Sequence, residues 1–421
     1  MLIRTLYTIF LALVSPVLLF GLYRNKPNKP KFGNRWKEHF GIIQKLKSND
    51  RPIWIHAVSV GECIAATPLI KALKKENPTQ PILVTTTTST GAEQISKLGS
   101  LVEHRYMPID FRFAVKSFLK IIQPRKMLII ETELWPNTLN EVHQFGVPII
   151  IVNARLSKKS HNNYAKFQPI FNLITPCLTQ VLCQNKIDAD YFHSLGIPHA
   201  KLKITGSIKF DIEISTTAKK LAKDLRQNIG SDRPIWIAAS THKGEDIHIL
   251  NAHKQVLKEI PNALLILVPR HPERFNDVFE LCAQQNFETV RRTSKRQVSK
   301  TTQVYLGDTV GEMLTFIGAS DTCFMGGSLL GTEVGGHNVL EPAALGVPII
   351  TGPSYYNFSF IVESLINIGA IQISTSINLG STVSDLLLEH NQRDEQSSKL
   401  LDFVQENSGS LNKTLTLVNE Y

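Results

Sequence analysis

Short apolar runs alternate with amphipathic helical stretches along most of the chain, and polar turns separate them. The runs are continuously apolar, which is typical of parallel strands that are buried on both faces of a sheet. The helical stretches would cover those faces. We therefore predict an α/β protein with parallel sheets, whose main strands are 52–57, 81–85, 126–130, 147–152, 234–239, 263–268, 304–306, 322–325 and 347–350.

The N-terminus has a different pattern. No formal charge lies between Arg4 and Arg24, and the run from Leu6 to Leu22 is almost wholly apolar. That run is just long enough to span a bilayer, because about 17–25 residues are needed. A cleaved signal peptide is the alternative, but no small-x-small cleavage site follows. Basic residues follow instead: Arg24, Lys26, Lys29, Lys31, Arg35 and Lys37.

This basic flank predicts that the next domain lies on the cytoplasmic side of a membrane, against anionic lipid headgroups. We therefore expect an uncleaved N-terminal membrane anchor helix within residues 1–25. Pro16, in the middle of the run, leaves open a shallow anchor in one leaflet.

Size and charge narrow the class of protein. A chain of 421 residues is too long for one ordinary core and favours two domains. A formal net charge of +10 favours an anionic partner, such as nucleic acid, a membrane surface or a phosphorylated substrate. Nucleic acid is not expected, since the chain has no zinc-finger spacing and no aromatic-basic RNA-binding motif. Five cysteines without a CxxC pair indicate a reducing compartment rather than a disulfide framework.

A metal site is not expected either. Asp188 and Asp190 could suggest one, but their surroundings are helical, so side chains two residues apart point in different directions. No other cluster has the spacing of metal ligands.

Carboxylates follow several predicted strands of the first half, at the edge where parallel sheets bind ligands. Glu62 lies at a helix start after one strand, and Glu131 and Glu133 follow another. Glu62 could be a general base for a hydroxyl, or it could only complement the helix dipole. Lys209, after a short strand, is a candidate cation for the site or an ordinary surface lysine.

The second half carries phosphate-type loops. The stretch 325–342 is glycine-rich and leads into a helix that we expect to begin near Asn338, with Glu341 in its first turn. Its backbone N–H groups could cradle an anion, or the glycines could only allow a turn. Arg270, at a strand end, suits phosphate binding. The basic loop from Arg291 to Lys300 is expected to be a solvated face.

Two parallel-sheet, Rossmann-like domains whose polar strand ends face each other across a cleft are the layout of the GT-B glycosyltransferases. Along essentially its whole length the chain resembles the 3-deoxy-D-manno-octulosonic acid (Kdo) transferases of lipopolysaccharide assembly. The matching segments are 56–62 (HAVSVGE), 131–137 (ETELWPN), 153–157 (NARLS), 206–211 (GSIKFD), 268–275 (VPRHPERF), 335–338 (GGHN) and 340–342 (LEP).

The resemblance implies an inverting glycosyltransferase that moves Kdo from the donor CMP-Kdo to the lipid A precursor lipid IV-A, with no cofactor and no metal. It implies that Glu62 is the proton acceptor and that Glu131 and Lys209 stabilise the transition state. The implied CMP-binding residues are Pro269, Arg270, Val310, Gly311, Glu312, Asn338, Val339, Leu340 and Glu341. The segment from Leu330 to Val334 is longer than in the family pattern, and Val339 stands where proline is common.

The expected domain organisation follows from these assignments. Residues 1–25 form the anchor, 26–213 the acceptor-binding domain and 214–385 the donor-binding domain, while 386–421 form a helical segment that could pack back on the first domain. Another GT-B nucleotide-sugar enzyme, such as an epimerase or a transferase with a different acceptor, is the alternative. A phosphorylase would need a lysine placed for a pyridoxal cofactor. An anchored solute-binding protein would need a lipidation cysteine or a cleaved signal, where this chain has Arg24.

Overall fold

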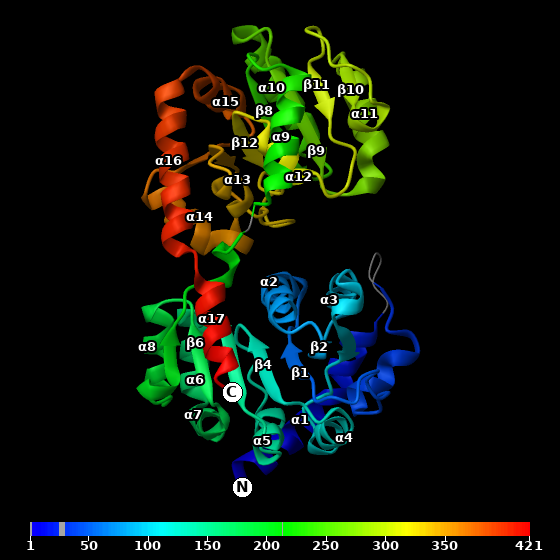
Figure 1. Cartoon of the computed structure of the whole chain (residues 1–421), viewed down its shortest axis with the longest axis vertical. Coiled ribbons are helices and arrows are strands. Elements are labelled where there is room, and N and C mark those ends of the chain that lie inside the picture. Colours follow the sequence, from blue (N-terminus) through cyan, green and yellow to red (C-terminus); the bar gives the residue numbers. More distant parts are fainter. Residues whose placement is uncertain (1, 25–29, 213) are drawn as a thin grey trace. The chain divides into compact units, whose positions relative to one another are not determined.

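The computed structural model of the protein describes residues 2–24, 30–212 and 214–421. Its contacts divide the chain into two compact units: unit 1 is Met1–Asp211 with Asn407–Tyr421, and unit 2 is Ile212–Glu406. Each unit contains one parallel sheet with helices on both faces (Figure 1). The domain boundaries expected from the sequence stay predictions, because contacts alone do not show which part folds independently. Lys26, Lys29 and the predicted boundaries at 25/26 and 213/214 lie outside the described residues.

Unit 1 has a seven-stranded sheet of order β3-β2-β1-β4-β5-β6-β7. The four main strands predicted for this half are confirmed. Two edge strands, β3 and β7, are short and only partly buried, so they carry no long apolar run. The strands are β1 Ile53–His56, β2 Ile82–Thr86, β3 Glu103–Tyr106, β4 Lys126–Ile130, β5 Ile149–Ala154, β6 Gln180–Cys183 and β7 Leu202–Ile204.

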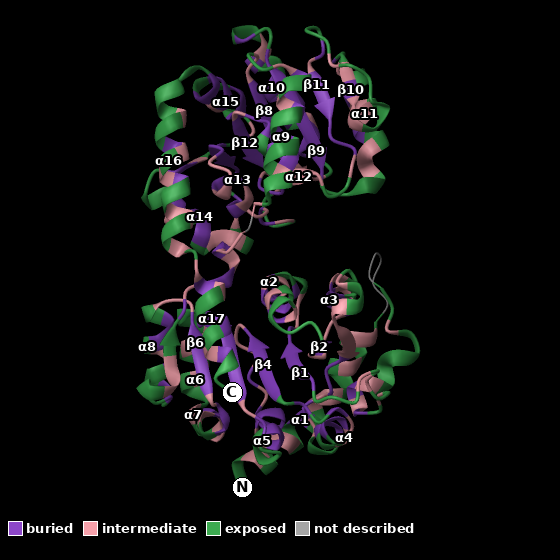
Figure 2. Ribbon diagram, viewed as in Figure 1, coloured by how far each residue is buried: buried purple, intermediate pink, exposed green. Residues whose placement is uncertain are grey.

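Successive side chains of these strands enter two different cores. Trp54 packs with Leu83 and Phe118 on one face, while Ile55 packs with Val84 on the other. Figure 2 shows the strands buried and the helices exposed on their outer sides. The helices of unit 1 are α1 Leu2–Tyr23, α2 Val60–Glu76, α3 Ser89–Ser96, α4 Arg112–Ile122, α5 Pro136–Gln144, α6 Lys158–Lys166, α7 Gln168–Ile174, α8 Lys186–Ser194 and α17 Ser410–Asn419, with the 3-10 helices η1 Gly33–Phe40 and η5 Ile208–Phe210.

The last helix, α17, packs against the rest of unit 1, where it contacts the segment 206–211. Asp211 accepts hydrogen bonds from the backbone N–H groups of Gly409 and Leu411, at 2.6 and 2.7 Å, and so caps the helix start. Gly206 has a φ of +87°, and a Cβ there would lie 2.2 Å from Oγ of Ser410. The glycine is therefore required both by its backbone conformation and by the close approach of α17.

Unit 2 has a seven-stranded sheet of order β10-β11-β9-β8-β12-β13-β14. Trp236, Leu265 and Val256 lie in its buried core. The strands are β8 Ile235–Thr241, β9 Leu264–Pro269, β10 Thr289–Arg291, β11 Val304–Leu306, β12 Thr322–Met325, β13 Ile349–Thr351 and β14 Ile371–Ile373. The helices are α9 Thr216–Ile229, α10 Asp246–Glu259, α11 Phe275–Gln284, α12 Met313–Gly318, α13 Leu340–Ala344, α14 Ser359–Asn367, α15 Leu379–Leu388 and α16 His390–Asn407.

The apolar N-terminal run forms α1, which among the described helices is the one long and apolar enough to cross a membrane. Two polar side chains of α1 form hydrogen bonds with the rest of unit 1. Tyr7 donates to Oδ2 of Asp110 at 2.9 Å, and Asn137 donates to Oγ1 of Thr8 at 3.0 Å. Many of its apolar side chains are exposed, among them Leu6, Phe10, Leu13, Val17 and Phe20.

Candidate active site

Glu62 lies in the first turn of α2, directly after the carboxyl end of β1. The helix begins at Val60, because Ser59 caps it and accepts a hydrogen bond from the Glu62 N–H. The Glu62 carboxylate accepts from the Val58 N–H and from the Ser59 hydroxyl, both at 2.8 Å. These bonds hold the carboxylate in one orientation at the strand edge.

Burial raises the pKa of Glu62 above its ordinary value, and the negative charge of Glu131 raises it further, while its hydrogen bonds oppose the shift. A raised pKa makes the carboxylate a stronger base once it has lost its proton. The geometry therefore suits a general base as well as a helix cap.

Glu131 and Lys209 form an ion pair, with Nζ 2.7 Å from Oε1. Glu131 follows β4 with a left-handed φ of +63°, a conformation that non-glycine residues adopt only where surrounding structure enforces it. Lys209 lies in η5, which Asn153 holds by accepting from the Ile208 N–H at 3.2 Å. Lys209 is thus not an ordinary surface lysine.

Glu133 lies near the same carboxylates. Burial raises its pKa to about 7, and the charges of Glu62 and Glu131 add to the shift. Two carboxyl groups with a raised pKa, those of Glu62 and Glu133, therefore lie at one edge of the unit 1 sheet beside the ion pair of Glu131 and Lys209. Such a concentration of perturbed groups is typical of an active site.

The glycine-rich loop after β12 does bind an anion, but the anion is part of the protein. The carboxylate of Glu245 accepts from the N–H groups of Gly327, Ser328 and Leu329 at 2.6, 2.9 and 3.0 Å. It also accepts from the His242 N–H at 3.0 Å. The expectation that this part of the loop cradles a ligand phosphate is therefore wrong: the N–H groups of residues 327–329 are already occupied.

The donor segments predicted from the resemblance lie beside this loop. The ring of His337 stacks on that of His242, and their Nε2 atoms are 2.8 Å apart, so one nitrogen donates and the other accepts. His271 packs edge-on against His242. Burial lowers the pKa of His337 to about 3, and the charge of Arg270 contributes to that shift.

Arg270 is exposed at the end of β9. Within the described chain, its guanidinium makes no hydrogen bond or ion pair, whereas Arg274 pairs with Asp246. Its charge also acts on the half-buried carboxyl of Glu341, whose pKa is raised by burial and lowered in part by Asn338 and Arg270. Arg270 is therefore a cation available to a ligand.

The predicted helix start needs a small correction. Helix α13 begins at Leu340 rather than near Asn338, and the side chain of Asn338 accepts from the Leu340 N–H at 3.1 Å. Val339 and Leu340 are buried. Any ligand contact of these two residues must therefore be made through the backbone.

Residues 310–312 precede helix α12. Val310 is 78% exposed and Gly311 has a φ of +90°. The Glu312 carboxylate is occupied by Arg292, whose Nη2 lies 2.7 Å from Oε1. Arg291 similarly pairs with the buried Asp308 at 2.7 Å. The expectation of a wholly solvated basic loop from Arg291 to Lys300 is thus wrong at its first two residues.

The segment Leu330–Val334, which we expect to be longer than in the family pattern, is held by residues after β13. Tyr356 donates its hydroxyl to the carbonyl of Thr332 at 3.0 Å, and Asn357 donates to that of Val334 at 2.6 Å. These two hydrogen bonds hold the segment in one conformation against the residues that follow β13.

Asp188 has a structural role. It accepts from the Leu156 N–H at 2.7 Å and lies in α8, as the sequence indicated. Within the described residues, no group of three or more His, Cys, Asp or Glu side chains could hold a metal ion.

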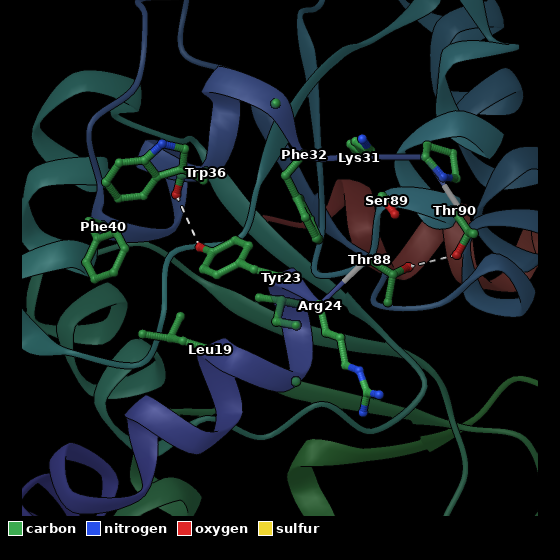
Figure 3. A pocket seen from close by; sticks show the side chains of 14 residues that line it. Leu19, Tyr23, Arg24, Lys31, Phe32, Trp36, Phe40, Thr88, Ser89 and Thr90 are labelled. Carbon is green, nitrogen blue, oxygen red and sulfur yellow. Dashed lines mark hydrogen bonds between the residues drawn. The ribbon is translucent and has the colours of Figure 1, made fainter. Parts of the chain in front are cut away.

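A cavity of about 810 Å³ lies in unit 1 between the end of α1, η1 and the loop after β2 (Figure 3). Its walls combine aromatic side chains with two cations, Arg24 and Lys31. The aromatic and hydroxyl-bearing residues that line it are Tyr23, Phe32, Trp36, Phe40, Thr88, Ser89 and Thr90.

Sequence reasoning missed two residues of unit 2, Glu245 and His242. Both stand in the turn after β8, directly after a predicted strand, so strand-end position was the available signal. The contacts of this turn depend on the order of strands in the sheet, in which β8 lies beside β12.

Comparison with known proteins agrees with the resemblance. The family model for 3-deoxy-D-manno-octulosonic-acid transferases matches residues 34–212. The chain is 38% identical to the 3-deoxy-D-manno-octulosonic acid transferase of Haemophilus influenzae over 99% of this chain and 98% of that protein. It is 36% identical to a solved C-terminal CMP-Kdo binding domain from Acinetobacter baumannii, covering 48% of this chain and 99% of that one, with a TM-score of 0.41.

A UDP-GlcNAc 2-epimerase from Neisseria meningitidis has a TM-score of 0.54 at 14% identity, covering 87% of this chain and 98% of that one. This likeness shows the fold alone, which is the GT-B arrangement of two Rossmann-like sheets. The identity to a Kdo transferase along the whole chain shows the family. The chain therefore belongs to the 3-deoxy-D-manno-octulosonic acid transferases, which are glycosyltransferases.

Proposed function

We propose that the protein transfers Kdo from CMP-Kdo to lipid IV-A with inversion, as a step of lipopolysaccharide biosynthesis. The observation that carries the proposal is the grouping of Glu62, Glu131 and Lys209 at one edge of the unit 1 sheet. A family of Kdo transferases needs a base for the acceptor hydroxyl, and Glu62 is the oriented carboxylate with a raised pKa at that edge.

In the proposed step, the acceptor hydroxyl oxygen forms a bond to the anomeric carbon of Kdo while the bond from that carbon to the phosphate oxygen of CMP breaks. Glu62 takes the hydroxyl proton, and CMP leaves with the electron pair. Lys209, held by Glu131, stabilises negative charge that develops during transfer. The ion pair also keeps the Lys209 ammonium oriented before substrate arrives.

Unit 2 would hold the donor. Arg270 is the free cation for the CMP phosphate, and the backbone around Gly311 and before α13 offers N–H groups. Val310 provides an exposed apolar surface for the base. Pro269, Glu312 and Glu341 would complete the site as neighbours of these groups.

The acceptor proposal is supported by the surroundings of α1. An amphipathic phosphoglycolipid needs apolar contacts for its acyl chains and cations for its phosphates. The cavity beside Tyr23 and Trp36 offers both kinds of group, with Arg24 and Lys31 as the cations. It is therefore a suitable place for part of lipid IV-A.

We also propose that α1 holds the enzyme at the cytoplasmic face of the inner membrane. Tyr7 donates a hydrogen bond to Asp110 and Thr8 accepts one from Asn137 on one side of the helix, while exposed apolar side chains between Leu6 and Phe20 are free for lipid. This arrangement favours insertion into one leaflet over a perpendicular span. Anionic headgroups would lie against the basic residues that follow the helix.

The direct test incubates purified full-length protein with CMP-Kdo and lipid IV-A in detergent micelles. Release of CMP together with a lipid product heavier by one or more Kdo units is the expected result, measured by mass spectrometry. Absence of both products would contradict the proposal. CMP release without a heavier lipid would show donor hydrolysis and leave the acceptor wrongly assigned.

A further inference from the structure

Glu245 is a fully buried carboxylate in the turn between β8 and α10. Each of its two oxygens accepts two backbone hydrogen bonds. Oε2 accepts from His242 and Gly327, and Oε1 accepts from Ser328 and Leu329. All the acceptor positions of an ionised carboxylate are thus used, and every donor is a backbone N–H group.

Consecutive N–H groups that point at one centre form an anion-binding nest. The nest of residues 327–329 therefore has the form of a phosphate site, and Glu245 takes the place of the phosphate. Ser328 is the central residue of the nest. Its hydroxyl donates to the Met325 carbonyl at 2.7 Å and accepts from the Gly352 N–H at 2.8 Å. The loop is consequently rigid before any ligand binds.

The nest adjoins the proposed donor site. Gly327 has a φ of +71°, and a Cβ there would lie 2.9 Å from Cδ2 of His337. The Gly327 carbonyl accepts from the Gly336 N–H at 2.8 Å, two residues before Asn338. A nucleotide held at Arg270 and Asn338 would therefore have the negative charge of Glu245 on one flank.

We propose that Glu245 determines donor specificity, because its carboxylate fills the nest of residues 327–329 and so excludes a second phosphate group. The site then accepts a nucleoside monophosphate sugar and rejects nucleoside diphosphates. A diphosphate has no free N–H groups to bind at this nest, and its added charge is repelled by the buried carboxylate. This inference rests on the proposed function, since it concerns the same nucleotide site.

The test compares the affinities of the full-length protein for CMP and CDP by calorimetric titration in the presence of EDTA. The unmodified protein is expected to bind CDP no more tightly than CMP. Glu245→Gln removes the charge at nearly constant volume, and we expect it to shift the ratio of the two affinities toward CDP by about tenfold or more. The CMP affinity itself should fall, because one amide NH₂ then faces backbone donors.

Ser328→Ala is the matched control. It loosens the same loop but keeps the Glu245 charge, so both affinities should change together and their ratio should not. An equal effect of the two variants on the ratio would reduce Glu245 to a structural role and overturn the inference. Tighter binding of CDP than of CMP by the unmodified protein would overturn it even if Glu245→Gln failed to fold. Absence of any CMP binding would instead overturn the proposed nucleotide.

Discussion

Lys209 donates a hydrogen bond from Nζ to Oε1 of Glu131 at 2.7 Å, across 78 residues of sequence. The two side chains are about one-third and one-quarter exposed. A pair with this exposure adds little to stability, because solvent screens it and ordering both side chains costs entropy. The role of the ion pair is therefore to place a cation among the carboxylates of unit 1.

Lys209→Met is predicted to lower kcat by about 10²-fold, because charge that develops in the transition state loses its cation. The free energy of unfolding should fall by less than about 1 kcal/mol, as for a surface ion pair. Steady-state kinetics and urea unfolding measure the two effects. Lys399→Met breaks an exposed pair with Glu395 in α16 and serves as the control for kcat. A loss of several kcal/mol with unchanged kcat would assign Lys209 to stability instead.

Glu62→Gln is predicted to keep CMP affinity and to lower turnover by about 10²–10⁴-fold, since an amide cannot accept the acceptor's proton. The carboxylate must be ionised to act, and its pKa is raised. In the unmodified enzyme, activity should therefore decline as pH falls, beginning at a higher pH than an ordinary glutamate would require. A pH–rate profile with Glu62→Gln as the comparison tests both points. Near-normal turnover of the variant would place the base elsewhere.

Glu133→Gln is predicted to stabilise the protein at pH 8 by about 1–2 kcal/mol and to have little effect at pH 5. The pKa of Glu133 is about 7 in the folded state and lies near 4.5 when unfolded. Between pH 4.5 and about pH 7 the folded state binds more protons than the unfolded state, so the free energy of unfolding decreases as pH rises. Urea unfolding at both pH values measures the difference.

The exposed Glu93 in α3 provides the control, since Glu93→Gln also removes one negative charge from unit 1. An effect of Glu133→Gln that is the same at pH 5 and pH 8 would point to packing rather than to protonation.

Gly206→Ala is predicted to destabilise unit 1 by about 2–4 kcal/mol, through backbone strain and a clash with α17. Gly99→Ala is the matched control, because Gly99 also has a positive φ, of +55°, but open space around its Cβ position. That variant should cost only about 1 kcal/mol. Equal losses in the two variants would mean that strain alone matters and that α17 adapts.

Arg270→Ala is predicted to weaken CMP binding by about 10–100-fold, the effect of removing a charge-assisted hydrogen bond to phosphate. The change should be smaller at high salt, since the site is exposed. Arg296→Ala, at an exposed arginine of the same unit, controls for net charge. Calorimetric titration of CMP gives both values, and an unchanged affinity in Arg270→Ala would remove that residue from the donor site.

Much of the fold could be predicted from the sequence, because continuous apolar runs specify buried parallel strands without reference to distant residues. Strands β3, β6, β10 and β14 were not predicted. The edge strands β3 and β10 carry charged residues such as Arg105 and Arg291, whereas β6 and β14 are only four and three residues long. Glu62 and Arg270 could be proposed from their positions at strand ends. The ion pair between Glu131 and Lys209 could not be predicted, because the two residues follow different strands.

By itself, the sequence determined the alternation of strands and helices, the apolar N-terminal helix and the edge of each sheet at which polar groups gather. Only the tertiary structure decided which anion occupies the glycine-rich loop. Strands β8 and β12 are neighbours in the sheet although the turn that carries Glu245 precedes Gly327 by 82 residues. Local sequence specifies that N–H groups are available, but the order of strands brings the buried carboxylate to them.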